Sequence, residues 1–448
     1  MTAFHADGGG GPSTSSREAT ELCLARIADP QGEGARAFTR VYAEAARAAA
    51  DFADNMQRLG VEAGPLAGLP VSIKDLFDVR GETTLAGSIA LKDAPPATRD
   101  AEIVRRLRRA GAVIVGKTNM TEFAFSGLGL NPHYGTPAGP WRREERRIPG
   151  GSSSGAGVSV ADGMALAAIG TDTGGSVRIP AAICGLVGFK PTARTVPLEG
   201  ALPLSQSFDS IGPLAHDVAT CARIYSVLAG LAPQPLRARD PSSLTLAVAR
   251  NYVLEQMEPA VAHTCEAALR RLSAAGVRLK ETAFPVFDQL PNIFGDGGIV
   301  GAEAHAWHRD LIDRSSSLYD PRVLVRILRA KDRTLAGYFA LLAERARLIR
   351  QWQNEVADAD AVVMPTIPIV PPMMRDLEDD DAYGRINLLV LRNPTVVNAL
   401  DGCAISLPCH ELGEAPVGLM LAAPGGRDVD LLRVANAVEP LLRPPAGA

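Results

Sequence analysis

Short apolar runs alternate with helical segments that end at glycine over much of this chain. Alternating apolar positions predict a strand over 69–73. A segment with apolar residues on one face then predicts a helix that is capped by Asp100 and ends at Gly111. The apolar run 112–117 follows directly and predicts a buried strand.

The same order of elements returns in the second half of the sequence. The pattern predicts a strand over 244–249, a helix over 260–275 that ends at Gly276, and a strand over 277–282. Strands and helices that alternate in this way are typical of an α/β protein. No internal repeat of fixed period is visible.

Three further segments have a distinct composition. The glycine- and serine-rich stretch 1–16 predicts a flexible tail that leads into a helix capped by Ser16. The alanine-rich stretch 41–59 predicts a helix, because alanine is the best helix former. The segment 285–320, rich in proline, glycine and serine, predicts loops and short helices that form a substrate-facing wall.

Composition narrows the class of protein. Of the 448 residues, 46% are hydrophobic and 21% are charged, which is the ordinary globular range. The formal net charge of −4 disfavours a partner such as duplex nucleic acid, whose binding proteins usually carry a clear basic excess. We therefore expect no nucleic-acid partner.

The sequence also carries no signal for a membrane or for secretion. The apolar run 361–374 contains four prolines and cannot form one spanning helix. The N-terminus has neither a basic region nor an apolar core of a signal peptide. Six scattered cysteines without a CxxC pair suit free thiols in a reducing compartment. These observations predict a cytoplasmic protein that does not bind membranes.

The chemistry is concentrated in two glycine- and serine-rich segments, 149–163 and 170–181, which flank a predicted small-residue helix over 155–168. Glycines allow positive φ angles and close approach of a ligand to the main chain. The stretch from Asp172 to Ser176 predicts a nest of backbone N–H groups that would stabilise a negative oxygen, with Ser176 placed as a nucleophile.

Composition alone leaves several hydrolase mechanisms open. Residues 151–155 match GxSxG with Ser153 as the nucleophile of an α/β-hydrolase-type esterase, although no apolar strand precedes this serine as that elbow requires. The seven histidines form no HExxH motif, so a metal site is not expected. Lys74 is a base if burial keeps it neutral, and otherwise a surface residue paired with Asp75 or Asp78.

Longer motifs decide between these alternatives. The chain resembles the amidase signature family of serine hydrolases over GLPVSIKDLFDVRGETT at 68–84, GKTNMTEF at 116–123, the whole of 149–191, and the tail 408–439. The resemblance implies a single α/β domain over 17–448, with a large mixed twisted sheet surrounded by helices. It also implies an amidohydrolase without a metal or an organic cofactor.

The resemblance further implies a catalytic Ser–cisSer–Lys triad. Ser176, the last residue of the TDTGGS stretch, matches the nucleophile. Ser152 matches the bridging serine, which follows an unusual cis peptide bond, and Lys74 matches the base. In this mechanism Lys74 accepts a proton from Ser152, which in turn accepts the proton of Ser176.

Other positions carry supporting roles by the same resemblance. The oxyanion hole would be formed by the backbone N–H groups of four residues: Thr173, Gly174, Gly175 and Ser176. The supporting residues are Gly151, Ser153, Asp172 and Arg178. The family usually has two glycines after its serine pair, whereas Ser154 and Ala156 depart from that pattern, so a slightly altered turn is expected.

For the substrate, the sequence predicts a small apolar or aryl amide, with esters and carbamates (urethanes) as further substrates of the same acyl chemistry. The proline- and methionine-rich run 364–374 and Phe125 would form an apolar wall. The alternative is the glutaminase subunit of a tRNA-dependent amidotransferase. That subunit usually has Gln where Ile179 stands, and glutamine recognition requires polar groups. The expected assembly is a monomer or a homodimer formed by the N-terminal helices.

Overall fold

The computed structural model describes residues 15–232, 235–237 and 239–442. Most of the predicted tail therefore lies outside the described residues. Within them, eleven strands form one sheet. The strands are β1 (Phe38–Val41), β2 (Pro70–Lys74), β3 (Val113–Thr118), β4 (Ala167–Asp172), β5 (Val187–Lys190), β6 (Ser210–Ala215), β7 (Thr245–Ala249), β8 (Arg278–Thr282), β9 (Ala361–Pro365), β10 (Cys403–Pro408) and β11 (Gly418–Ala423).

Helices surround this sheet and fill the connections between its strands. They are α1 (Ser16–Ala28), α2 (Gly34–Ala37), α3 (Ala43–Arg58), α4 (Glu102–Arg109), α5 (Ser154–Ala161), α6 (Arg178–Cys184), α7 (Val218–Ala229), α8 (Pro259–Ala274), α9 (Pro291–Phe294), α10 (Gly298–Ser315), α11 (Pro321–Leu328), α12 (Leu335–Glu355), α13 (Asp380–Ala399) and α14 (Asp428–Leu442). No described helix is long and apolar enough to span a bilayer.

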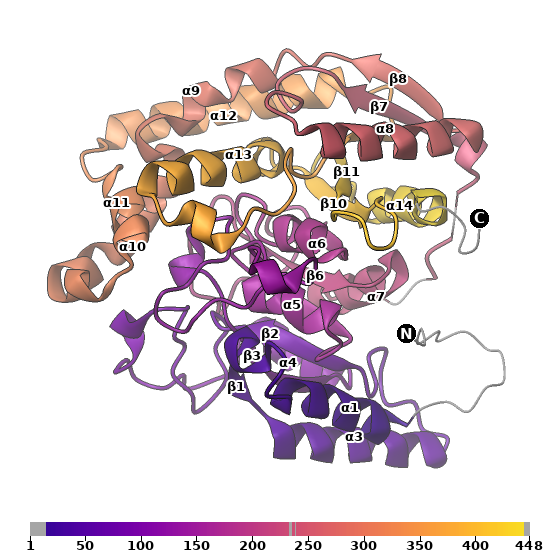
Figure 1. The fold of residues 1–448 in the computed structure, drawn as a ribbon, viewed down its shortest axis with the longest axis vertical. Helices are drawn as coiled ribbons and strands as arrows, with labels where there is room; N and C mark the ends of the chain where they lie inside the picture. Colours follow the sequence, from indigo (N-terminus) through magenta and orange to yellow (C-terminus); the bar gives the residue numbers. More distant parts are fainter. Residues whose placement is uncertain (1–14, 233–234, 238, 443–448) are drawn as a thin grey trace.

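The sheet is mixed and continuous from one end of the molecule to the other. Its strand order is β1-β3-β2-β4-β6-β5-β10-β11-β9-β7-β8. Strands β3, β2 and β4 pair in parallel at one end and β9, β7 and β8 at the other, while the central pairs are antiparallel. In Figure 1, α1 and α3 lie at one end and α8, α9 and α12 at the opposite end. The mixed α/β architecture is the predicted one.

Burial on both faces explains why the central strands read as continuous apolar runs. Every residue of β2, β3, β4, β10 and β11 is buried. A strand covered by helices on both faces has no polar side, so its sequence loses the alternation of a half-exposed strand. Lys74 at the end of β2 is therefore an unusual residue for its place.

Most predicted elements have close counterparts in the structure. The predicted strands over 69–73, 112–117, 244–249 and 277–282 correspond to β2, β3, β7 and β8, and the predicted helices over 41–59 and 260–275 to α3 and α8. Gly111 and Gly276 adopt positive φ angles directly after the residues that end α4 and α8. These glycines end the helices as predicted.

Four expectations about local structure were wrong. The first helix is capped by Ser15 rather than Ser16, because Ser15 and Glu18 form a reciprocal capping box. Asp100 does not cap α4, since its carboxylate instead accepts the Arg80 N–H and the Arg108 guanidinium.

The other two errors concern the lengths of helices. The predicted helix over 155–168 is α5, which ends at Ala161 because Gly163 adopts a positive φ, and 167–168 already belong to β4. The segment 285–320 contains the 18-residue helix α10, which the surrounding glycines conceal in the sequence.

Candidate active site

Lys74 lies at the end of β2 and points into the protein interior. Its side chain is fully buried, and its Nζ donates to Ser152 Oγ at 2.7 Å and to Thr171 Oγ1 at 2.9 Å. Thr171 is on β4, the strand that pairs in parallel with β2. The alternative of a surface lysine paired with Asp75 is wrong, because Asp75 forms a buried ion pair with Lys117 at 2.7 Å.

Burial also changes the acidity of Lys74. It lowers the pKa of Lys74 to about 7, although the negative charges of Asp209 and Asp172 act in the opposite direction. A large share of Lys74 is therefore neutral near pH 7. A neutral amine 2.7 Å from a serine hydroxyl can accept a proton.

The loop before α5 places Ser152 against this amine. The peptide bond between Gly151 and Ser152 is cis, as the resemblance implies, and Ser152 is fully buried. The Gly151 N–H donates to the carbonyl of Gly127 at 2.8 Å. A Cβ at Gly151 would lie 2.5 Å from the backbone nitrogen of Gly129, so only glycine fits in front of Ser152.

A turn between β4 and α6 carries Ser176 at its end. Ser176 is 4% exposed, and Gly175 before it has a φ of +123°. The Gly175 N–H donates to Asp172 Oδ1 at 2.8 Å, so it is engaged within the turn. The backbone N–H groups of Thr173, Gly174 and Ser176 make no hydrogen bond to any residue that the structure describes. These three groups are available to an oxyanion.

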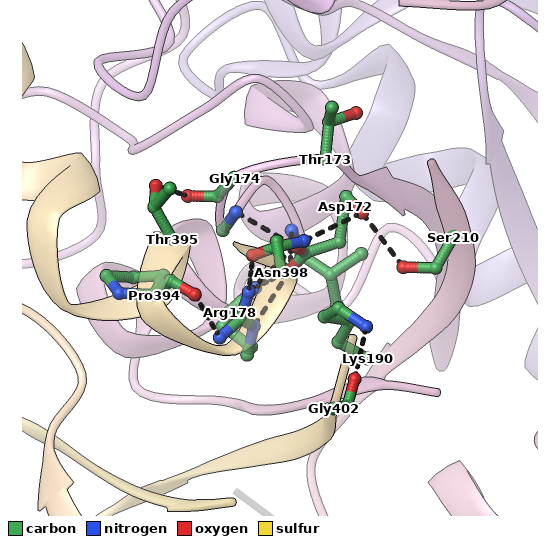
Figure 2. Close-up of polar contacts among 12 residues, drawn as sticks. Asp172, Thr173, Gly174, Arg178, Lys190, Ser210, Pro394, Thr395, Asn398 and Gly402 are labelled. Atoms are coloured by element: carbon green, nitrogen blue, oxygen red, sulfur yellow. Dashed lines mark hydrogen bonds and ion pairs between the residues drawn. The ribbon is translucent and has the colours of Figure 1, made fainter. Parts of the chain in front are cut away.

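Asp172 and Arg178 fix the shape of this turn through a buried ion pair. Arg178 Nη2 and Nε donate to the Asp172 carboxylate at 2.8 and 3.0 Å, and Asn398 Nδ2 donates to it at 2.9 Å. Figure 2 shows Arg178 and Asn398 directed at Asp172. Burial disfavours the charged carboxylate, but Arg178 outweighs it and holds the pKa of Asp172 well below its usual range.

Helix α13 closes over the same turn from the C-terminal half of the chain. Thr395 Oγ1 donates to the carbonyl of Gly174 at 3.1 Å, and the carbonyl of Pro394 accepts from Arg178 Nη1 at 3.0 Å (Figure 2). The turn is therefore held both from within and from a distant segment. Preorganised donors of this kind need no rearrangement when charge develops on a substrate.

A second carboxylate lies on the other side of the turn. The Thr173 hydroxyl donates to Asp209, which also accepts the N–H groups of Leu204 and Ser205 at 3.0 and 3.1 Å. Burial raises the pKa of Asp209 to about 6, in spite of these hydrogen bonds. Asp209 is thus mostly ionised at pH 7; it binds the turn through Thr173, and its negative charge also acts on Lys74.

The predicted residues do not all make the expected contacts. In the described part of the chain, no hydrogen bond joins the side chains of Ser152 and Ser176. Ser153 is buried and donates weakly to the carbonyl of Thr171 at 3.5 Å, and the residues before it form a loop. The strand that a nucleophile elbow requires is therefore missing before Ser153.

Three functional contacts were missed by sequence reasoning. Thr171 stands inside the GTDTGGS stretch, so its place next to the turn could have suggested it. Asp209 and Asn398 lie 36 and 226 positions after their partners in the turn, and no local pattern indicates either of them. Among the residues described, no group of three or more His, Cys, Asp or Glu side chains is arranged to hold a metal ion.

Comparison with known proteins identifies the family. The family described as Amidase matches residues 18–432. The chain belongs to the amidase signature family. It is an enzyme family that acts on amide C–N bonds.

Individual relatives cover nearly the whole amidase fold. A crystal structure of an amidase superimposes with a TM-score of 0.85 at 32% identity, covering 95% of this chain and 96% of that one. The 2-amino-5-chloromuconic acid deaminase of Comamonas testosteroni is 37% identical over 404 residues, 89% of this chain and 86% of its own. A glutamyl-tRNA(Gln) amidotransferase subunit from Chloroflexus aggregans is 34% identical, covering 94% of this chain and 92% of its own.

Proposed function

We propose that this amidase hydrolyses the C–N bond of a small amide through an acyl-enzyme on Ser176, with Lys74 as the base and Ser152 as the bridge between them. One observation carries the proposal. Lys74 is a fully buried lysine with a pKa of about 7, and its Nζ lies 2.7 Å from the hydroxyl of Ser152. A buried amine that forms no ion pair with a carboxylate of the described residues is suited to moving protons rather than to holding the fold together.

The first half-reaction forms the acyl-enzyme. Neutral Lys74 takes the proton of Ser152 Oγ, and Ser152 takes the proton of Ser176 Oγ, which attacks the amide carbonyl. The carbonyl oxygen becomes an oxyanion that accepts hydrogen bonds from the N–H groups of Thr173, Gly174 and Ser176. Gly175 was expected to be a fourth donor, but its N–H is already bound to Asp172.

Departure of the amine completes the first half-reaction. The tetrahedral intermediate collapses to the acyl-enzyme when its C–N bond breaks, and the departing amine takes a proton back through Ser152 from the ammonium of Lys74. In the second half-reaction, water gives a proton to the same relay and attacks the ester on Ser176. The ester bond breaks, the carboxylic acid leaves, and Ser176 regains its proton. Esters and carbamates present the same carbonyl chemistry and belong to the proposed range.

Apolar side chains support an acyl part that is mainly apolar or aromatic. Phe125 is 9% exposed and sits in the loop whose Gly127 carbonyl holds Gly151. Ile179 is buried, and its Cδ1 lies 3.2 Å from the position that a Cβ of Gly127 would occupy. The same Cδ1 lies 2.7 Å from the position of a Cβ at Gly175, so an apolar side chain packs directly against the turn that carries Ser176.

The alternative function is that of a glutaminase subunit in a tRNA-dependent amidotransferase, the class of enzyme for which the relative from Chloroflexus aggregans is named. Ile179 argues against it, because this buried side chain offers no polar group at a position where that subunit usually has Gln. A site that binds an amide side chain gains its selectivity from polar partners. We therefore favour a hydrolase that acts without a transfer partner.

Single substitutions test the assignment of the triad. Ammonia release from a panel of small primary amides is measured for the unchanged protein and for S176A, S152A and K74A. We expect each substitution to lower kcat by at least about 10³-fold, because residues that act as one unit fail together. S154A is the matched control, since Ser154 is a fully buried serine of the same segment whose hydroxyl donates to the Asn119 carbonyl at 3.4 Å, outside the proposed relay. Activity that survives in S176A but is lost in S153A would contradict the proposal.

A further inference from the structure

Helix α11 carries two arginines on one face that differ in their partners. Arg322 and Arg326 are four residues apart and therefore neighbours on the helix surface. Arg322 Nε donates to Asp380 at 2.7 Å, and its guanidinium lies 4.6 Å from the centroid of the Tyr383 ring. The Arg322 guanidinium thus pairs with a carboxylate and also contacts an aromatic ring.

Arg326 contacts an aromatic ring but forms no ion pair with any residue described. Its Cζ lies 4.9 Å from the centroid of the Phe125 ring, and its side chain is partly buried. No hydrogen bond or ion pair reaches the Arg326 guanidinium from any residue described. A guanidinium offers five N–H donors in a flat fork that fits a carboxylate. None of these donors is bound by a residue that the structure describes.

Partial burial of this cation is unfavourable without a partner. Desolvation lowers the pKa of Arg326, and the nearby Arg329 acts in the same direction, while Tyr383 only partly offsets them. Arginine nevertheless stays charged at any pH that proteins tolerate. Charges removed from water are normally paired, so a bound anion would supply what the fold leaves out.

The ring beneath Arg326 belongs to a loop that is hydrogen-bonded to the segment before Ser152. Phe125 is two residues before Gly127, whose carbonyl accepts the N–H of Gly151, the residue bonded to Ser152. The loop is held firmly, since Asn387 Oδ1 accepts both the Gly127 N–H at 2.8 Å and the Ser126 hydroxyl at 2.9 Å. Arg326 therefore reaches the loop that shapes the catalytic serines.

We propose that Arg326 binds a carboxylate of the substrate, so that the amides hydrolysed by this protein are those of dicarboxylic acids. The apolar acyl part would lie along Phe125 and the free carboxylate would meet the guanidinium. This inference rests on the proposed function and narrows its substrates to amides with a carboxylate at the far end of the acyl chain. Arg326 would then be a specificity-determining residue, without part in the proton relay.

Two matched pairs of amides test the inference. Fumaramate and crotonamide share an unsaturated four-carbon acyl part, and adipamate and hexanamide a six-carbon one; only the first member of each pair has a carboxylate. Two readouts are used: kcat/KM for ammonia release, and the concentration of each amide that halves the rate at which a fluorophosphonate labels Ser176. The second readout needs no turnover.

The comparison uses three variants of α11 and its end. R326M keeps an unbranched side chain over Phe125 without the charge, and R326K keeps the charge without the fork. R329Q is the matched control, because Arg329 is exposed at the end of the same helix and its substitution removes the same charge.

The expected result is a preference for the carboxylate member in at least one pair. R326M should reduce this preference by about 100-fold, because it removes one partner of a desolvated charge pair. Most of the loss should come from a higher KM for the carboxylate amide and from a higher concentration of that amide needed to halve the labelling rate of Ser176. The neutral member should change by less than about threefold, R326K should restore part of the preference, and R329Q should keep it.

The contrary result is also well defined. Equal or better use of the neutral amide in both pairs overturns the inference, as does an equal loss for both members in R326M. Failure of the proposed function has a different signature, which is that the fluorophosphonate leaves Ser176 unlabelled in the unchanged protein.

Discussion

Two lysines in this amidase, Lys74 and Lys190, are almost equally buried but have different neighbours. Burial lowers the pKa of Lys190 to about 8 and the pKa of Lys74 to about 7. Lys190 donates at 2.7 Å to two backbone carbonyls, those of Pro191 and Gly402, which have no proton to give. Lys74 donates to hydroxyl groups, which do. The neighbours, rather than the burial, make Lys74 the candidate base.

The pH dependence of the rate follows from the lowered pKa of Lys74. Below pH 7 the amine is protonated and cannot accept the proton of Ser152, so activity is lost as pH falls. We predict that log kcat/KM rises with a slope of about one up to an apparent pKa of about 7 and is level above it. A profile measured with a neutral amide checks this, since the substrate then has no titration of its own. A limb near pH 10 would mean that Lys74 is an ordinary lysine.

Substitution of Asp209 also tests the lowered pKa of Lys74, because the direction of the expected shift is known. Its negative charge raises the pKa of Lys74, so D209N should move the limb of the pH profile to lower pH. The rate above the limb should also fall, because the Thr173 hydroxyl loses its carboxylate acceptor. E303Q is the control, since Glu303 contacts Ser205 and Ser207 but is not among the charges that act on Lys74. A limb that stays in place in D209N, or moves to higher pH, contradicts this account.

At the scale of single residues, the sequence indicated the chemistry but not the contacts. Ser152, Ser176 and Lys74 were proposed because their motifs are long and specific. Their contacts were not accessible, since Lys74 meets Ser152 and Thr171 across separations of 78 and 97 positions. Spacing cannot show which residues a sheet brings together over such distances.

At the scale of elements, the turn from β4 to α6 is the part of the fold on which the proposed mechanism depends most directly. Its carboxylate, Asp172, receives donors from its own turn, from Arg178 and from Asn398 on α13. Removal of one member of a buried pair leaves the other charge without compensation. The turn is therefore a point where stability and activity depend on the same residue.

Substitution of Asp172 should show both effects. We predict that D172N lowers the free energy of unfolding by about 3–5 kcal/mol, because the fully buried Arg178 loses its counter-charge, and that activity falls with the shape of the turn. Urea titration followed by circular dichroism measures the stability. S210A is the control, since the Ser210 hydroxyl donates only to the Asp172 backbone carbonyl at 2.8 Å and its loss should cost about 1 kcal/mol. Equal stability of D172N and S210A would contradict the argument.

Elements were predicted well where local sequence decides them and poorly where it does not. Strands β2 and β3 were found from apolar runs bounded by glycine. Helix α10 was missed because Gly295 and Gly297 lie directly before it and Gly298 is its first residue, and these glycines suggest a loop. Two of these, Gly297 and Gly298, have positive φ angles and mark the start of the helix rather than its absence.

At the scale of the whole molecule, one continuous sheet brings two halves of the chain together at the candidate active site. The N-terminal half supplies Lys74, Ser152 and Ser176, while α13 and β10 from the C-terminal half support the turn and its flank. The mixed α/β class followed from the order of predicted elements. The strand order did not, because neighbours such as β5 and β10 are more than 200 residues apart in the chain. The proposed carboxylate site also depends on this long-range packing, since α11 meets the loop at Phe125.

The central claim is that Ser176 is the nucleophile and that Lys74 activates it through Ser152. The most direct measurement is the intact mass of the protein after exposure to a fluorophosphonate, with peptide mapping of the label. We predict a single adduct on Ser176, formed at least about 100-fold more slowly in K74A because the base is missing. A label on Ser153, or equal labelling rates in K74A and the unchanged protein, would contradict the account.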